Sequence, residues 1–214
     1  MNAQAKSTAS LLFFDTETTG LPLWQEPSED PRQPYIVQIA ALHLDDDGTE
    51  ISRFCEIVKP DGGYTIPDEV VAVHGITTER AEAEGRPLVE VLDWFLKPGF
   101  HSHADALLVA HGLGFDKRMV RIQLKRLGME VEAEAFQARR GFCTMNEAKP
   151  ICRIPPTNAM MATGRKTWKT PSLAEAYQHF IGKKIAGAHD AMVGAEACRD
   201  IYFAIRAQKE GSAA

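Results

Sequence analysis

The chain has 214 residues, of which 44% are hydrophobic and 25% are charged, and its formal net charge is −5. This length suits one sizeable α/β domain with its own core, and no apolar run approaches the roughly 20 residues that span a bilayer. The acidic balance does not indicate a nucleic-acid ligand, so any phosphate binding would need local basic patches or metal ions. The four cysteines form no CxxC pair, which argues against a zinc site or a disulfide framework and favours a reducing cytoplasm.

The first half of the chain predicts three strands and then helices. Residues 1–10 lack the apolar centre of a signal peptide and are expected to form a disordered lead-in. The expected strands are residues 11–16, 35–44 and 51–58, with a proline-rich loop at residues 22–34 and a turn at Asp45-Asp46-Asp47-Gly48. The expected helices begin at Pro67 and at Thr77 and cover residues 87–97.

The second half alternates between strand and helix. Its expected elements are a buried strand at 106–110, helices at 115–127, 172–180 and 191–207, and a loop at 155–171. This order predicts an α/β fold with a mixed central β-sheet of about five strands, a three-strand meander first, flanked by helices. We expect a single domain over residues 11–208 and a flexible tail at residues 209–214.

Two carboxylates follow the first strand directly. Asp15 and Glu17 come after the apolar run Leu11-Leu12-Phe13-Phe14. Residues two apart on a strand point to the same face, so these carboxylates would repel each other and lose hydration unless a divalent cation lay between them. The segment therefore indicates half of a metal site, although a polar turn after a core strand explains the segment alone equally well.

Two further segments could supply the other half of such a site. Asp116 begins a helix just after the strand at 106–110, where a carboxylate is also favoured simply by the helix dipole. His189 lies at the start of the last helix, where a histidine is commonly a cap or a surface residue. A helix N-terminus favours neutral imidazole, which is the form that a general base needs.

Together the three segments resemble the DnaQ-like 3′–5′ exonucleases of the DEDDh subclass. Asp15 and Glu17 in FFDTETTGL match the first family motif, the pair Phe115-Asp116 matches the second, and His189 matches the histidine of the third. The order and spacing of these motifs agree with the family over roughly residues 11–205. The resemblance implies a ribonuclease H-like fold and a metal-dependent exonuclease.

The resemblance also implies roles for individual residues. Asp15 would bridge two Mg²⁺ or Mn²⁺ ions, Glu17 would bind one of them, and Asp116 would support the other. His189 would take a proton from the attacking water, and a nucleoside monophosphate would leave the 3′ end of DNA or RNA. The residues expected around the 3′-terminal nucleotide are Thr18, Gly20, Leu21, His74 and Phe115.

Position 194 departs from the family pattern. The third motif should carry an aspartate five residues after its histidine, and this chain has Gly194. Without that carboxylate, the ion shared with Glu17 should bind more weakly. Asp190 lies one turn earlier on the same side of the helix and could reach the ions, or it could simply cap the helix.

Three interpretations of Gly194 therefore stay open. The chain could be an active type of enzyme with an impaired site, a catalytically inactive module that binds nucleic acid or protein, or an engineered or accidental inactivation. The expected partners are single-stranded or 3′-end nucleic acid and, as a further candidate, a DNA polymerase, with no membrane and a cytoplasmic location. Candidate contacts to a phosphate backbone, each of which also fits an ordinary solvated surface, are Lys117-Arg118, Arg165-Lys166 with Trp168-Lys169, and Lys183-Lys184.

Overall fold

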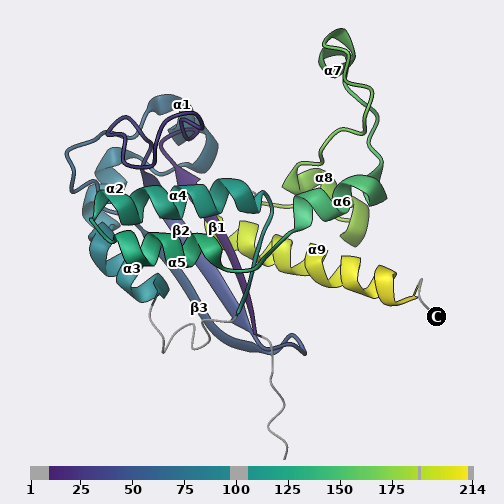
Figure 1. The fold of residues 1–214 in the computed structure, drawn as a ribbon, viewed down its shortest axis with the longest axis horizontal. Helices are drawn as coiled ribbons and strands as arrows, with labels where there is room; N and C mark the ends of the chain where they lie inside the picture. The colour runs from purple at the N-terminus through teal and green to yellow at the C-terminus, as the bar shows by residue number, and fades with distance from the viewer. Residues whose placement is uncertain (1–9, 97–105, 188, 212–214) are drawn as a thin grey trace, which may run out of the picture.

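A computed structural model describes residues 10–96, 106–187 and 189–211. Within these residues the chain forms a five-stranded sheet in the order β3-β2-β1-β4-β5 (Figure 1). The strands are β1 (Leu11–Thr18), β2 (Ile36–Leu44), β3 (Glu50–Ile57), β4 (Leu107–Ala110) and β5 (Gly141–Cys143). The first three pair as an antiparallel meander, whereas β4 is parallel to β1 and β5 is parallel to β4. The predicted mixed sheet with a leading meander is confirmed.

Helices cover both faces of this sheet. They are α1 (Asp68–His74), α2 (Thr78–Glu84), α3 (Leu88–Leu96), α4 (Leu113–Arg126), α5 (Glu130–Ala138), α6 (Thr144–Cys152), α7 (Asn158–Ala162), α8 (Leu173–Ile181) and α9 (Ala191–Gly211). The sequence patterns assigned neither α5, β5 nor α6, and α7 lies inside the segment expected to be a loop. These four elements are short, between three and nine residues, and short elements carry little periodic signal.

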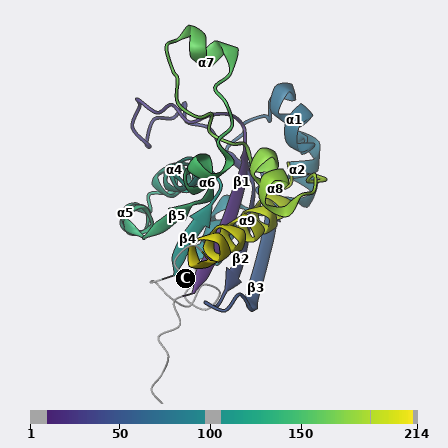
Figure 2. The same ribbon diagram turned by 90° about the vertical axis from the view of Figure 1, so that its right-hand side faces the viewer.

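The central strand β1 is buried from both sides. Its side chains alternate between the two faces, so Phe14 packs near Phe95 of α3 and Phe136 of α5, with ring centroids 5.8 and 6.0 Å away. Phe13 instead meets Tyr202 of α9 at 5.3 Å. Figures 1 and 2 show the resulting layers, with α4 and α5 on one side of the sheet and α8 and α9 on the other.

Three elements meet at one edge of the sheet. Because β1 and β4 are parallel, with Phe13 opposite Val109, their carboxyl ends lie at the same end of the sheet, which is the edge meant here. The chain leaves β4 through Gly112, whose φ of 110° favours glycine, and enters α4 at this edge. The backbone N–H of Ala191, the first residue of α9, donates to Gln38 Oε1 of β2 at 3.0 Å. This convergence creates the place where the candidate residues can meet.

The described part of the chain begins at a buried residue and ends in a long helix. Ser10 is buried, and its carbonyl accepts a hydrogen bond from the Leu107 N–H, while residues 1–9 of the expected lead-in lie outside the described residues. The helix α9 continues to Gly211 and so enters the segment expected to be a tail. None of the helices in the described part of the chain is long and apolar enough to cross a membrane.

Candidate active site

The strand β1 carries the first two candidate carboxylates to the converging edge. Asp15 and Glu17 are both half-buried, whereas their neighbours Thr16 and Thr18 are 6% and 9% exposed. Glu17 lies directly opposite Gln38 of β2 in the antiparallel register. The alternation confirms that Asp15 and Glu17 share one face of the strand.

Asp116 reaches the same edge from the first turn of α4. It is 2% exposed, and its Oδ1 accepts a hydrogen bond from the Thr16 hydroxyl at 2.8 Å. This bond joins the carboxyl end of β1 to the start of α4 and explains why Thr16 is buried. The helix dipole alone therefore does not explain Asp116, since a hydrogen bond fixes its side chain against the strand that carries Asp15.

Burial and neighbouring negative charges disfavour the ionised forms of the three carboxylates. Burial is the largest cause that raises the pKa of Asp15 well above its usual value, and the charges of Asp116 and Glu17 raise it further. Burial also raises the pKa of Asp116 to about 7, although hydrogen bonds from Thr16 oppose this. The pKa of Glu17 rises to about 7 through burial and the negative charge of Asp190. A cluster of desolvated acids with raised pKa values is typical of functional sites.

Gly194 leaves space that Asp15 occupies. A Cβ atom at position 194 would lie 2.7 Å from Asp15 Cγ and still closer to its Oδ2. The Asp15 carboxylate thus leans against α9, where an aspartate side chain at position 194 would begin. The absence of a side chain at position 194 and the orientation of Asp15 are one structural feature.

Asp190 is committed to the start of α9. Its Oδ1 accepts from the N–H groups of Met192 at 3.0 Å and Val193 at 3.3 Å, which is the geometry of a helix N-cap. Its Oδ2 accepts from Gln38 Nε2 at 3.3 Å. Both carboxylate oxygens are engaged, so the structure favours the capping role over a role as a substitute ligand.

His189, His74 and Thr18 lie near one another beside this cap. His189 is exposed in the turn that precedes α9. The pKa of His74 is lowered by burial first and by the charge of His189, while a backbone hydrogen bond of Thr18 opposes the shift. The Nδ1 of His74 accepts from the Ile76 N–H at 3.1 Å, which fixes the ring. His74 thus lies beside Thr18 at the end of β1, and His189 lies near His74.

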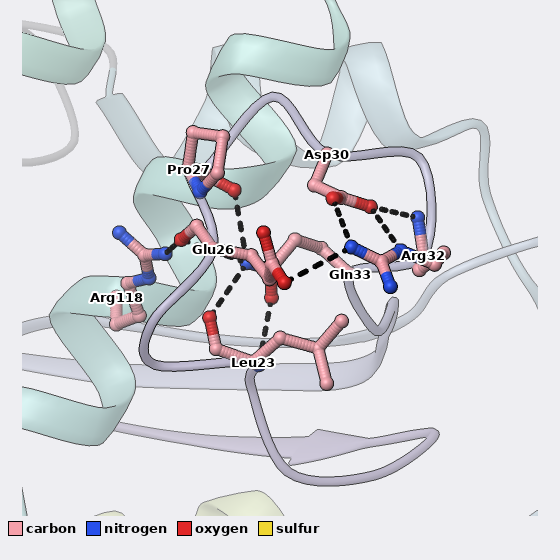
Figure 3. Close-up of polar contacts among 7 residues, drawn as sticks. All are labelled: Leu23, Glu26, Pro27, Asp30, Arg32, Gln33 and Arg118. Atoms are coloured by element: carbon pink, nitrogen blue, oxygen red, sulfur yellow. Dashed lines mark hydrogen bonds and ion pairs between the residues drawn. The ribbon is translucent and has the colours of Figure 1, made fainter.

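A closed loop over residues 19–35 continues from β1 and stands on α4. Its ends meet, because the Thr19 N–H donates to the Tyr35 carbonyl and the Tyr35 N–H donates to Thr19 Oγ1, both at 2.9 Å. Figure 3 shows the Gln33 amide at its centre, where Oε1 accepts from the Leu23 N–H and Nε2 donates to the carbonyls of Leu23 and Pro27. Arg118 of α4 holds the Glu26 carbonyl at 2.5 Å. The loop is therefore fixed at both ends and internally.

The residues expected around the substrate lie on this loop and its neighbours. The Thr18 hydroxyl donates to the Gly20 carbonyl at 2.9 Å, and Leu21 is 79% exposed. Phe115 packs partly against the core just before Asp116.

Lys117, expected to contact a phosphate backbone, is instead structural. Its side chain is buried, and its ammonium donates to the carbonyls of Gln137 and Arg139 at 2.6 and 2.9 Å. That interpretation of Lys117 was wrong, because the lysine satisfies carbonyls that would otherwise be unpaired at the end of α5.

The oxygen donors match Mg²⁺ or Mn²⁺ in chemistry, since these ions prefer carboxylate ligands. Across the described residues, however, no three His, Cys, Asp or Glu side chains form a ready set of metal ligands. Asp15 leans towards Gly194 while Asp116 is held by Thr16, so the carboxylates are close but not convergent. The donor chemistry suits a hard divalent ion, and Gly194 offers no further ligand beside Asp15.

Acids at the carboxyl end of β1 and in the first turn of α4, on a sheet that begins with an antiparallel meander, are the arrangement of a ribonuclease H-like nuclease. The family model described as exonuclease (RNase T) matches residues 12–202. The chain belongs to this exonuclease family, and its DnaQ-like fold is the one that the motifs predicted.

Individual relatives cover different parts of the chain. The PolC-type DNA polymerases III of Thermotoga petrophila and Thermotoga maritima are each 32% identical over 125 residues, which is 58% of this chain and 8% of theirs. Exonuclease I of E. coli in a zinc-bound complex with single-stranded DNA has a TM-score of 0.67 and 18% identity, over 95% of this chain and 41% of that one. Exonuclease I of Methylocaldum szegediense has a TM-score of 0.66 and 19% identity, over 94% and 41%. This chain spans less than half the length of each relative.

The sequence interpretation missed two residues that organise the site. Gln38 connects α9 to the strand beside Glu17, and Thr16 fixes Asp116. Gln38 did leave a signal, since it is a polar residue inside the apolar run at 36–44, and a buried amide needs partners. Thr16 left none, because a threonine between two acids is equally expected in a turn.

Proposed function

We propose that this chain hydrolyses the terminal phosphodiester at the 3′ end of single-stranded DNA or RNA and releases nucleoside monophosphates. The observation that carries the proposal is the meeting of Asp15, Glu17 and Asp116 at one sheet edge with raised pKa values. Burying the acids costs free energy that the hydrogen bonds from Thr16 offset only in part, since the pKa values stay raised, so a cationic ligand is the physical reason to place them together. Membership of the exonuclease family supports the same function.

Asp15, Glu17 and Asp116 would hold the Mg²⁺ or Mn²⁺ ions. When bound, the ions would neutralise phosphate charge and make the attacking water more acidic. Thr16 keeps Asp116 oriented, and His189, in the turn before α9, would accept the proton of that water. In this proposal Thr18, Gly20, Leu21, His74 and Phe115 surround the 3′-terminal nucleotide, with Leu21 free to contact a base because it is 79% exposed.

A second candidate function is a binding module that does not cut. Gly194 and the lean of Asp15 towards α9 favour it, because they leave the carboxylates divergent. The names of the relatives add candidate partners, namely single-stranded DNA as in the exonuclease I complex and a DNA polymerase as in the PolC proteins. We retain the cytoplasm as the proposed location on the pattern of unpaired cysteines.

A direct test follows a 5′-labelled single-stranded oligomer of DNA or RNA with Mn²⁺. We expect shortening from the 3′ end, slow for this chain and lost in Asp116→Asn, which keeps the shape of the side chain but removes its charge. The proposal fails if neither this chain nor Gly194→Asp shortens any oligomer while both bind it. That outcome establishes the binding module instead.

A further inference from the structure

The segment at residues 153–170 is a basic arm. It contains Arg153, Arg165, Lys166 and Lys169 and no aspartate or glutamate. Four positive charges therefore gather in a short segment of a chain whose net charge is −5. Such a local excess of one sign attracts a partner of the opposite sign.

The arm is ordered but contributes nothing to the core. None of residues 153–170 is buried, yet its two sides are joined by a bond from the Lys169 N–H to the Ile154 carbonyl at 2.9 Å. The short α7 at its tip is capped by the Thr157 side chain. Long loops without core packing commonly serve binding.

The exposed groups of the arm suit a single strand of nucleic acid. Arg165 and Lys166 are exposed and form no ion pair with any residue in the described ranges, whereas Lys169 pairs with Glu175. Trp168 is 45% exposed next to them. Cationic groups beside an exposed aromatic ring match the phosphates and stacked bases of a single strand.

The base of the arm stands at the candidate site. The carbonyl of Pro171 is hydrogen-bonded to His111 Nε2 at 3.2 Å, and His111 directly follows β4, five residues before Asp116. In both Figure 1 and Figure 2 the arm with α7 projects from the same end of the molecule as α1. A strand with its 3′ end at Asp15 could therefore extend along this arm.

We propose that residues 153–170 bind the single strand upstream of its 3′-terminal nucleotide, with Arg165 and Lys166 on phosphates and Trp168 against a base. The proposal rests on the proposed function for the direction of the strand. The arm does not touch the reacting atoms, so it adds affinity for long strands and leaves the chemistry of the last nucleotide unchanged.

The test measures binding by fluorescence anisotropy in EDTA, with labelled oligomers of about 20 and about three nucleotides, longer and shorter than one strand-binding site. For Arg165→Ser with Lys166→Ser we expect roughly tenfold weaker binding of the long oligomer and a salt slope lower by about 1.4, from two lost phosphate contacts. Trp168→Ala should weaken binding of the same oligomer without changing the salt slope. The short oligomer should bind all variants alike.

A matched control removes the same charge elsewhere. Arg80→Ser with Arg86→Ser changes α2 and the segment just before α3, where both arginines already pair with glutamates. The proposal is overturned if this control weakens binding of the long oligomer as much as the arm variant does. It is also overturned if the arm variant binds with an unchanged Kd and salt slope, and that result would make an acidic protein surface the better partner for the arm. Because binding is measured without hydrolysis, a chain that binds through the arm but never cuts refutes the proposed function alone.

Discussion

At the scale of single residues, Gly194 decides how Asp15 is held. A Cβ at this position would lie 2.7 Å from Asp15 Cγ, so Gly194→Asp must displace the Asp15 side chain from α9. Because the change adds a carboxylate ligand beside Asp15, we expect Mn²⁺-dependent cleavage to rise by about 100-fold, the scale of one restored transition-state interaction. Rates of mononucleotide release measure this.

The control for that change is Gly194→Ala, which displaces Asp15 without supplying a carboxylate. It should stay as slow as the original chain or become slower. If Gly194→Ala raises the cleavage rate as much as Gly194→Asp does, the position of Asp15 rather than a missing ligand limits the reaction.

Gln38 holds the start of α9 beside Glu17. It accepts from the Ala191 N–H at 3.0 Å and donates to Asp190 Oδ2 at 3.3 Å. Removing both bonds in Gln38→Leu should cost about 1–3 kcal/mol of stability, because a buried N–H is left unpaired. We further expect kcat to fall about tenfold with little change in KM, since His189 loses its position more than the substrate does.

The readout that separates positioning from stability is kcat measured well below the unfolding temperature. An unchanged kcat in a less stable Gln38→Leu protein would show that the residue serves only the fold. Gln38→Glu, which keeps an acceptor for Ala191 but repels Asp190, should be intermediate in stability.

The sequence could predict which acids meet but not how they are supported. Asp15 and Glu17 share a face because of strand period alone, and Asp116 follows a parallel strand whose end had to reach the same edge. The bonds of Thr16 and Gln38 depend on strand register and on the approach of α9, which no local pattern specifies. The role of Asp190 stayed open for the same reason.

At the scale of elements, the loop at residues 19–35 depends on one buried amide. Gln33 is 1% exposed and bonds the backbone of Leu23 and Pro27 (Figure 3). Gln33→Ala should cost about 2–4 kcal/mol, because several backbone groups lose a buried partner, and should speed hydrogen exchange at the Leu23 amide. KM should rise because Leu21 is no longer held beside the site.

Arg32→Ala is the matched change in the same loop. The side chain of Arg32 is 64% exposed and pairs with Asp30 and Glu26, and ion pairs with an exposed partner add little to stability. We expect no measurable change in unfolding midpoint. A loss equal to that of Gln33→Ala would show that the loop, rather than the amide, is sensitive to any substitution.

The long periodic elements were predictable and the short ones were not. The strands of the meander and the helices α4 and α9 carry clear patterns over eight or more residues. By contrast, β5 has three residues and is a strand only because β4 offers a parallel edge. The helix α6 even contains Pro150, which predicts a break in isolation.

At the scale of the whole molecule, the acid cluster links stability to pH. The pKa values of Glu17 and Asp116 rise from 4.5 and 3.8 to about 7 in the folded state. Between about pH 4 and 7 the unfolded chain has released protons that the folded protein retains, so the metal-free protein loses stability as pH rises. The loss should reach a few kcal/mol, mostly from Asp15 and Asp116, because the pKa of Asp15 is also raised by burial and solvent screens the half-buried Glu17.

Denaturant unfolding in EDTA at pH 5 and pH 8 measures this difference. Asp116→Asn should flatten the dependence and be more stable than the original chain at pH 8. The predicted effect of the acids on stability would be contradicted if the original chain were more stable at pH 8 than at pH 5 and Asp116→Asn showed the same trend.

The most direct test of the central claim, that these acids form a divalent-cation site, is calorimetric titration of Mn²⁺ at pH 8. The account predicts saturable binding by this chain, loss of that binding in Asp15→Asn and tighter binding in Gly194→Asp. Equal heats for this chain and for Asp15→Asn, with no gain in Gly194→Asp, would contradict it.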